Sequence, residues 1–451
     1  MRTWRTPNQP LRSLLREAGW SGARLAREIN ALAREQHRSL NYDRSTVSHW
    51  LAGTRPRPPA PQLAAEAFSR RLGRRVDVAE TGLSLHEGAA AHERADTPAD
   101  RLRRLGASPG EACDDVVHSP ADSMLPLWEQ WHPSRNRTAA PPPPGPPDLA
   151  VARAMLDLFS RHEAWFGGDS ARHALRAYLA TNVSAWLEQD LRPSFRRELL
   201  TTAGHLAYLC AFTHFDANLQ AAAQRYYLTA AELARHAGDR TGYAMAARGL
   251  SVQALSLGHD TDADLLAARA VRIGLPQSES AHQRAFFLGH LALTRARVGE
   301  HRASDEHFAT AEAYLHEPEP ERQPPIGSFH LAALTLQQAY AARARGDSRQ
   351  EAAGLRASLR HRPRQERRGR ALSLATLAEA QLDIGHLDLA CETWTSFLDL
   401  SEDLRSARVT DRLHTLLARL RPYTANRSAA EVHERARALR PRHLGGGDTI
   451  A

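Results

Sequence analysis

The stretch IGHLDLACETWTSF, from Ile384 to Phe397, contains the pattern on which the fold prediction depends. Gly385 follows a helical run, and Ala390 and Trp394 then place a small residue before a large one along the next helix. A glycine between two amphipathic helices supplies the permissive backbone of a tight turn. The stretch is therefore typical of a helical hairpin.

Three related turns lie upstream of this hairpin. The triplets LGH, VGE and RGD contain Gly258, Gly299 and Gly346, so the four glycines are separated by 41, 47 and 39 residues. The longest interval contains the insertion EPEPERQPP, which we expect to be a loop. Similar helices, in which small residues let paired helices approach and a large residue fills the gap, occur at Ser304–Phe308–Ala311 and Ala223–Tyr227–Ala230.

The repeated turns indicate an internal repeat. The pattern resembles degenerate tetratricopeptide repeats over roughly residues 200–420, with copies nearer to about 40 residues than to the usual 34. This resemblance implies an α-solenoid of helix pairs with a concave groove suited to a peptide or a partner protein. A generic helical bundle is the alternative. Both interpretations predict an all-α fold.

Composition limits the class of protein. A chain of 451 residues predicts two or three domains. Its three cysteines, Cys113, Cys210 and Cys391, are too sparse for a disulfide framework or a cysteine-based zinc site and suit a reducing compartment. The sequence shows no signal-peptide pattern and no apolar run of the roughly 20 residues that span a bilayer. We therefore expect a soluble cytoplasmic protein without a membrane partner.

The net charge of +8 is concentrated at one end of the chain. Residues 1–83 contain 15 arginines against 7 acidic residues, whereas the remaining 368 residues contain 44 basic and 44 acidic ones. The chain has no lysine. A basic module joined to a neutral body is the electrostatic signature of a protein that binds a polyanion.

Three regions are predicted from these changes in composition. Residues 1–83 form a compact helical domain, residues 84–148 a Pro-rich and partly disordered linker, and residues 149–451 the repeat domain. The linker ends in PPPPGPPD, which we expect to be an extended, semi-rigid spacer. Its more apolar segment SMLPLWEQWHP, at 123–133, is interpreted as docking on a neighbouring domain or as a partner-binding motif.

The basic region begins with two predicted helices. In LRSLLREAGW, Leu11, Leu14 and Leu15 form an apolar stripe of helical spacing. Ser21 can cap the helix SGARLAREIN, and Trp20 and Leu25 fit the positions of a hydrophobic staple around that cap.

The next stretch, NYDRSTVSHWLAGTRPRP at 41–58, predicts a third helix capped by Asp43. Val47, Trp50 and Leu51 share one face, and Gly53 ends the helix. A fourth helix, APQLAAEAFSRRLG, closes the unit through its apolar residues Leu63, Ala67 and Phe68.

The segments LAREIN and DRSTVSHWLAGTRPRP resemble the helix-turn-helix of phage-repressor (Cro/C1, XRE-like) domains over about 70 residues. The chain departs from that family in ALAREQHRSLNY, where the family has a much shorter turn. Either the second helix is extended or the turn carries a loop. Together with the linker and repeats, the chain resembles actinobacterial regulators of sporulation and antibiotic production, which implies a DNA-binding transcriptional regulator.

Seven residues are predicted to contact double-stranded DNA. Arg44 could bind guanine, while Ser45, Ser48 and His49 could contact base edges in the major groove. The phosphates would be held by Arg24, Arg55 and Arg57. The alternative is a solvated basic face. In that case the chain is a protein-interaction scaffold whose basic module binds an acidic partner.

No enzyme class fits the sequence. Without lysine there is no P-loop, and the histidines of HEGAAAHE, at 86–93, are six residues apart rather than four. We predict no catalytic residue, cofactor or metal. The repeat array could bind a peptide or protein in its groove, or pair two chains into a homodimer that suits two DNA half-sites. The operator, the direction of regulation and any effector do not follow from the sequence.

Overall fold

The computed structural model describes residues 7–35, 39–83, 97–107, 118, 144–318, 326–327 and 329–444. Every regular element in these ranges is helical and none is a strand, which confirms the all-α prediction. No helix in the same ranges combines the length and the apolar character needed to cross a bilayer. The segments at 86–93 and 123–133, and most of EPEPERQPP, lie outside the described residues.

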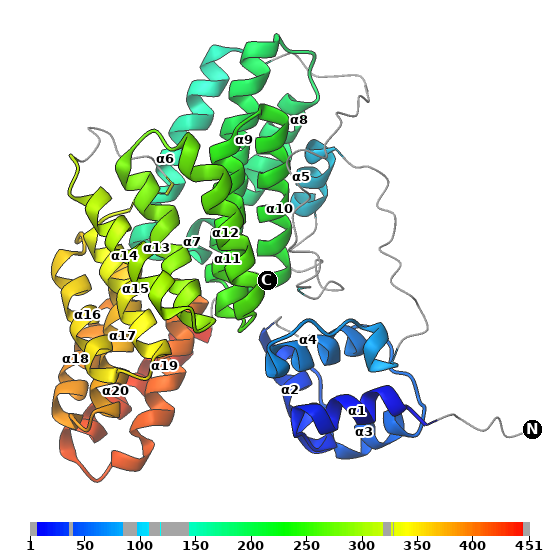
Figure 1. The fold of residues 1–451 in the computed structure, drawn as a ribbon, viewed down its shortest axis with the longest axis vertical. Coiled ribbons are helices and arrows are strands. Elements are labelled where there is room, and N and C mark those ends of the chain that lie inside the picture. Colours follow the sequence, from blue (N-terminus) through cyan, green and yellow to red (C-terminus); the bar gives the residue numbers. More distant parts are fainter. Residues whose placement is uncertain are drawn as a thin grey trace, which may run out of the picture.

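A small domain is built from the first four helices (Figure 1). They are α1 (Gln9–Ala18), α2 (Gly22–Glu35), α3 (Arg44–Leu51) and α4 (Ala60–Leu72), followed by a short helical turn at Ala79–Thr81. The three predicted apolar stripes pack in one core that is separate from the rest of the molecule, with Leu51 only partly buried at its edge. The predicted contributors to this core are Leu11, Leu14, Leu15, Val47, Trp50, Leu63, Ala67 and Phe68.

Helix α5 (Pro98–Ala107), inside the range predicted as linker, packs on the larger helical body. Leu102 and Leu105 are buried in the core of that body. A Cβ atom on Gly106 would lie only 2.0 Å from the Cβ of Ala180, so glycine permits the close approach. Ion pairs from Arg101 and Arg103 to Glu232 and Glu188 add to the docking.

The larger body, residues 144–444 of the described chain, begins with α6 (Pro146–Phe166), whose first turn uses prolines of the Pro-rich run. Proline suits this position because the first helical N–H groups have no intrahelical partner. A nearly continuous helix with a π-turn follows, comprising α7 (Asp169–Tyr178), Leu179–Val183 and α8 (Ser184–Leu187).

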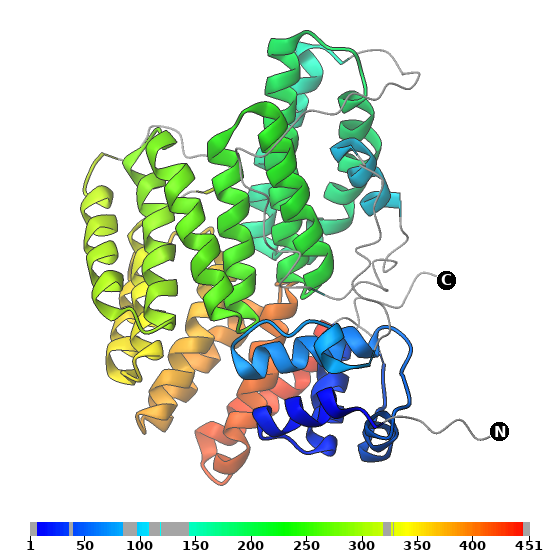
Figure 2. The same cartoon turned by 45° about the vertical axis from the view of Figure 1, so that its right-hand side comes forward.

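Five helical hairpins come next, and the two helices of each hairpin pack closely together (Figures 1 and 2). They are α9 (Pro193–Asp216) with α10 (Gln220–Ala237), α11 (Arg240–Ser256) with α12 (Asp260–Gly274), α13 (Ala281–Arg297) with α14 (His301–Leu315), α15 (Leu331–Ala344) with α16 (Ser348–His361), and α17 (Arg367–Asp383) with α18 (Leu387–Ser401). Short turns at Leu275–Gln277 and Arg421–Tyr423, with α19 (Ala407–Leu420) and α20 (Arg427–Leu444), complete the body. Successive hairpins contact one another, which is the arrangement of an α-solenoid.

The four predicted turn glycines each lie inside a hairpin and have positive φ values of 79–87°. The turn of the first hairpin, between α9 and α10, instead has Asn218 at φ 59°, a conformation that asparagine tolerates better than most residues. Asn218 precedes Gly258 by one repeat length. Searching for glycine alone therefore identified four of the five hairpins.

The small and large residues of the repeat pattern are all buried as predicted. Tyr227 of α10 shows how they work, because its ring lies against the backbone of α11 at Gly249. A Cβ atom at Gly249 would lie 2.4 Å from a carbon of the ring. In this repeat, a large side chain on one helix packs against a glycine on the next helix.

The apolar core of the array is divided along its length. One cluster extends from α5 to α15, a small cluster links α15, α16 and α17, and a third joins α17 to α20. Of the three cysteines, Cys210 and Cys391 are buried free thiols in the first and third clusters, and Cys113 lies outside the described residues.

Helix α6, at the start of the array, packs against both α9 and α17. Glu163 of α6 forms a buried ion pair of 2.5 Å with Arg368 of α17, and Arg368 also reaches Asp216 of α9 at 3.4 Å. The backbone N–H of Arg405 donates to the carbonyl of Phe166 at 2.6 Å. Burial raises the pKa of Glu163 to about 7, although Arg368 acts in the opposite direction. These contacts close the beginning of the array onto its end.

Candidate nucleic-acid interface

The candidate interface is the outer face of α3 with the turn that follows it. Val47 and Trp50 turn into the domain core and are buried. The seven residues predicted to contact DNA are all exposed, which fits their predicted position outside the core: Arg24, Arg44, Ser45, Ser48, His49, Arg55 and Arg57. The helical spacing thus separates a packing face from a polar face.

The start of α3 is fixed by Asp43, as predicted. Its carboxylate accepts a hydrogen bond from the backbone N–H of Thr46 at 2.8 Å and from the hydroxyl of Ser45 at 2.7 Å. These bonds lower the pKa of Asp43 to about 2, with the Thr46 backbone bond as the largest cause. Because the Ser45 hydroxyl donates its proton to Asp43, its oxygen remains available only as an acceptor.

The end of α3 is set by Gly53, which has φ 99°. The N–H of Gly53 donates to the carbonyl of Trp50 at 3.0 Å, and the N–H of Thr54 donates to that of His49 at 2.9 Å. This pair of bonds is a Schellman motif, so the predicted terminator is confirmed. The chain then leaves the helix with Arg55 and Arg57 exposed.

The connection between α2 and α3 explains the departure from the family pattern. Helix α2 runs to Glu35, so the first five residues of ALAREQHRSLNY extend that helix. The side-chain amide of Asn30 donates to the carbonyl of Tyr42 at 2.8 Å and accepts from its N–H at 2.9 Å. The ring of Tyr42 packs edge-on to Trp50, with centroids 5.2 Å apart. Asn30 thereby anchors the chain immediately before α3.

The N-terminus of α2 lies close to α3. The hydroxyl of Ser21 accepts from the N–H of Arg24 at 3.2 Å, which agrees with the predicted cap. A Cβ atom on Gly22 would lie 3.2 Å from Val47, so the two helices approach closely there. Trp20 stacks on Phe68 of α4 with ring centroids 5.6 Å apart. The first turn of α2 therefore packs against the inner face of α3.

Ion pairing distinguishes among the arginines of the domain. Several are compensated by carboxylates, namely Arg24 by Glu28, Arg70 by Glu35 and Glu66, Arg74 by Glu17 and Glu80, and Arg75 by Asp77. Among the described residues, no ion pair joins Arg44, Arg55 or Arg57 to a carboxylate. The same holds for Arg12, Arg16, Arg27, Arg34 and Arg71, so α3 and the turn after it carry part of the uncompensated charge of the domain.

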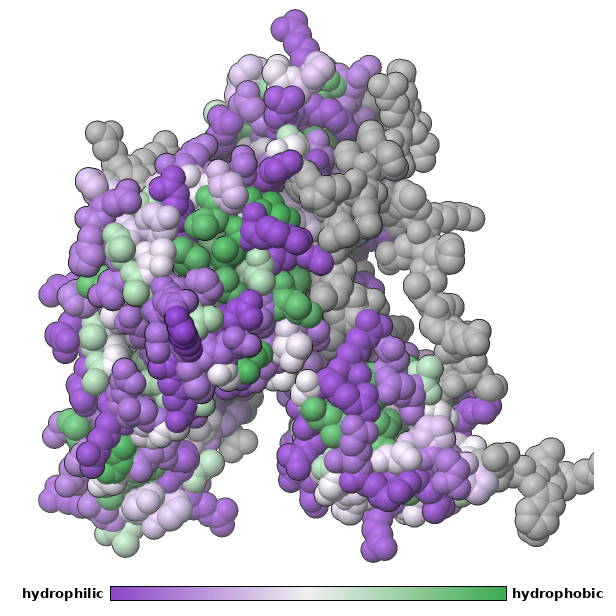
Figure 3. Space-filling view, viewed as in Figure 1, coloured by the Kyte–Doolittle hydropathy of each residue, from purple (hydrophilic) through white to green (hydrophobic). Residues whose placement is uncertain are grey.

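The larger body leaves this surface open. Helix α4 lies on the side of the domain nearer the array, and α3 lies on the opposite side (Figures 1 and 2). In the space-filling view the small domain is mostly hydrophilic, whereas hydrophobic residues gather on the array near α10–α12 (Figure 3). A long polyanion could therefore approach α3 without meeting the array.

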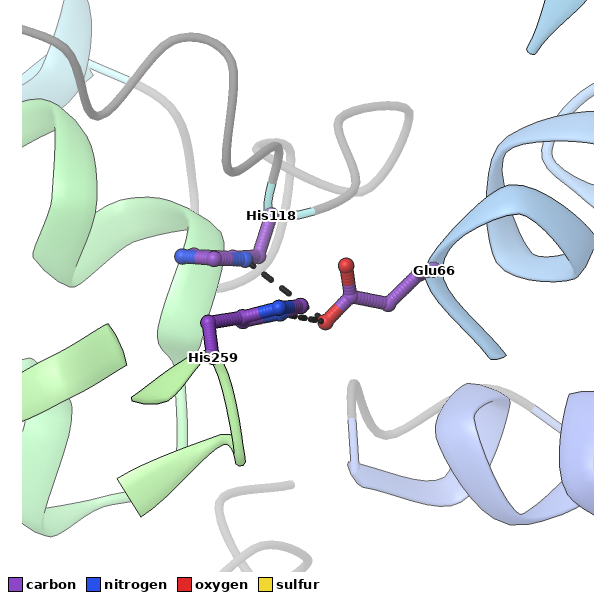
Figure 4. A group of neighbouring side chains, drawn as sticks. All are labelled: Glu66, His118 and His259. Atoms are coloured by element: carbon purple, nitrogen blue, oxygen red, sulfur yellow. Dashed lines mark hydrogen bonds and ion pairs between the residues drawn. The ribbon is translucent and has the colours of Figure 1, made fainter. Parts of the chain in front are cut away.

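Sequence reasoning missed a second group of polar residues, Glu66, His118 and His259, which come together between the domain and the array (Figure 4). Glu66 and His259 are 193 residues apart, so no local spacing links them. Only the folded structure brings Glu66, His118 and His259 together.

Comparison with known families gives one match. Residues 11–84 match the family described as the SP15 N-terminal domain. The matched range begins within α1 and extends through α4 and the helical turn after it, so it corresponds to the small domain. No curated protein matches the chain.

Proposed function

We propose that the chain is a DNA-binding transcriptional regulator in which α2 and α3 act as a helix-turn-helix. The observation that carries the proposal is the outer face of α3, where exposed Arg44, Arg55 and Arg57 have no carboxylate partner among the described residues. An α-helix of this kind fits the major groove of B-DNA. Acting on DNA, the protein would work in the cytoplasm, as a regulator of the sporulation and antibiotic-production type that its sequence resembles.

Each exposed residue has a distinct role in this proposal. Arg44, in the first turn of α3, would donate to guanine O6 and N7, and Ser48 and His49 would contact neighbouring base edges. Ser45 would accept a hydrogen bond from a base amino group. Arg55 and Arg57 would bind phosphates. Arg24, whose Nη2 lies 2.7 Å from Glu28, has further guanidinium N–H groups that would donate to a phosphate.

The repeat array is proposed to pair two copies of the chain. Helix α6 has exposed apolar residues at heptad spacing, with Val151, Leu158 and Trp165 exposed by 53%, 50% and 41%. A stripe of this spacing is typical of helix-to-helix packing. A symmetric dimer would present two copies of α3 to two half-sites. A peptide or protein bound by the array remains the other proposed partner.

Two substitutions test the roles of the arginines. Arg44→Ala should reduce the preference for one base pair by about 1–3 kcal/mol, because it removes a bidentate base contact. Arg57→Ala should weaken binding to every sequence alike, because it removes a phosphate contact. The slope of log affinity against log salt concentration should then fall by about one released ion. Both are measured by titrating full-length protein with selected genomic fragments at several salt concentrations.

Arg75→Ala is the matched control. It removes the same charge from an exposed arginine of the same domain, but Arg75 is already paired with Asp77 and lies outside α3 and its turn. Its DNA affinity should stay close to that of the unmodified protein. If all three variants lose DNA affinity equally, binding depends on the net charge of the domain. The proposal that α3 contacts the bases is then refuted. If no DNA binds at any salt concentration, the scaffold with an acidic partner becomes the better proposal.

A further inference from the structure

Three buried polar side chains from distant segments meet between the small domain and the array (Figure 4). Glu66 belongs to α4, His118 to the segment between domains, and His259 to the turn before α12. Their exposed fractions are 3%, 3% and 4%. Nε2 of His259 lies 3.0 Å from Oε1 of Glu66, and Nδ1 of His118 lies 3.7 Å from the same oxygen.

Several atoms of this group have no hydrogen-bond partner among the described residues. Both ring nitrogens of His118 are buried without one, and so is Oε2 of Glu66. A buried polar atom that loses water without gaining a partner destabilises a fold. The group therefore has the donor atoms for a further ligand and a physical reason to bind one.

The geometry is close to that of a metal site. Two imidazole nitrogens and one carboxylate oxygen form a donor set that zinc commonly uses. With metal–ligand distances near 2.0–2.1 Å, neighbouring donors in a tetrahedral site are roughly 3.3 Å apart. The two distances to Glu66 are 3.0 and 3.7 Å, and the three donor atoms all lie within 4.8 Å of one another.

The charge around the group is net negative. Arg70 lies between two carboxylates, with Nε 2.8 Å from Oε1 of Glu66, the oxygen that also faces the two histidines, and Nη1 2.9 Å from Oε2 of Glu35. One guanidinium thus faces two acidic groups, which leaves one negative charge when both histidines are neutral.

We propose that Glu66, His118 and His259 bind one divalent cation of the zinc class between the small domain and the array. Imidazole and carboxylate ligands suit zinc better than magnesium or calcium, which prefer oxygen ligands. Because the three ligands come from the domain, the connecting segment and the array, the ion fixes the position of α4 relative to α12. The proposal does not depend on DNA binding.

The test uses full-length protein prepared without a histidine tag. The protein is stripped with a chelator, reloaded with zinc and dialysed, and metal content is measured by mass spectrometry. We expect about one zinc ion per chain and a higher thermal midpoint in the reloaded sample, because an ion bound only to the folded state stabilises it. Cobalt in place of zinc should give the intense visible absorption of a tetrahedral site.

Glu66→Gln and His118→Ala should each lower zinc affinity by at least about tenfold, because even outer-shell partners of a metal contribute that much. His118 lies outside the described helices, so its replacement leaves the helical cores unchanged. The matched control is His330→Ala, which breaks a 2.7 Å histidine–glutamate pair that no second histidine joins within the described part of the chain. It should retain the zinc.

Two results would overturn the proposal. One is unmodified protein that retains less than about a tenth of an ion per chain and shows no zinc-dependent thermal shift. The other is zinc binding that His118→Ala and Glu66→Gln leave unchanged. Either would make the group a polar contact held by hydrogen bonds alone.

Discussion

Asp43 holds the first turn of α3 in place, and its carboxylate does so in the ionised form. The hydrogen bonds from Thr46 and Ser45 lower its pKa to about 2 from an ordinary value of 3.8. A carboxyl group with a lowered folded-state pKa contributes stability above its unfolded pKa and loses that contribution as the pH falls toward the folded value. The relevant window is therefore between about pH 4 and pH 2.

This predicts how the domain responds to acid. In the fragment 1–83, the thermal midpoint of the unmodified sequence should exceed that of Asp43→Ala at pH 7, because alanine cannot cap α3. The difference should narrow between pH 4 and pH 2 as Asp43 is protonated. Thermal melts followed by circular dichroism at several pH values measure this difference in midpoint. Asp43→Asn keeps a neutral cap, so the difference in thermal midpoint between Asp43→Asn and Asp43→Ala should not change with pH. If that difference also narrows between pH 4 and pH 2, groups other than Asp43 cause the effect.

The sequence predicted the residues of α3 well, because caps and faces depend on local spacing. Asp43, Gly53 and the buried pair Val47 and Trp50 all lie as expected. The hydrogen bond from Ser45 to Asp43 was not predicted, since two adjacent polar residues can either pair or remain free. No local rule brings Glu66 next to His259.

Among the helices, the contact between α10 and α11 depends on a missing side chain. Gly249→Ala would place a Cβ atom 2.4 Å from the ring of Tyr227, which is buried and cannot move freely. Overpacking of this kind typically costs about 1–3 kcal/mol. We expect Gly249→Ala to lower the stability of full-length protein by about that amount in chemical denaturation.

The control for this prediction is Gly204→Ala in α9. Gly204 is also a buried helical glycine, but the nearest atoms to a Cβ there lie 3.6 Å away, an ordinary contact. Because alanine is the better helix former by up to about 1 kcal/mol, this variant should be neutral or stabilising. A similar loss in both variants would show that any added methyl group disturbs the array, whatever its neighbours.

The extent of the array was predicted less completely than its type. Glycine turns were found because glycine readily adopts positive φ, and the turn at Asn218 was missed for the same reason, although the pattern Ala223–Tyr227–Ala230 had indicated the second helix of its hairpin. Helix α5 has a short apolar pattern within a polar region, and its position depends on Gly106 meeting Ala180. Such a contact between distant segments is visible only in the folded chain.

At the scale of the whole molecule, the small domain and the array have separate apolar cores. The fragment 1–83 should therefore fold alone. We predict that it binds its DNA site far more weakly than the full-length protein at the same salt concentration, because one half-site contact lacks the second. The measurements are DNA affinity and sedimentation mass of each. Equal affinities would refute the dimer.

The surface proposed for pairing can be tested in the full chain. Leu158→Glu in α6 should make the protein monomeric and reduce its DNA affinity, because a charge in a helix-to-helix contact is unfavourable. Leu265→Glu in α12 is the matched control, since the two leucines are exposed by 50% and 51%. If both variants remain dimeric, or if the unmodified protein is monomeric on and off DNA, pairing through α6 is wrong.

The closure of the array onto α6 constrains how such a protein can change in length. An open solenoid tolerates the gain or loss of a repeat because each repeat contacts only its neighbours. Here Glu163 must meet Arg368, and Phe166 must meet Arg405, across more than 200 residues of chain. Deleting one hairpin between α9 and α17 would displace Arg368 and leave Glu163 buried without its partner. The contacts of α6 with Arg368 and Arg405 thus constrain the number of hairpins that can stand between α9 and α17.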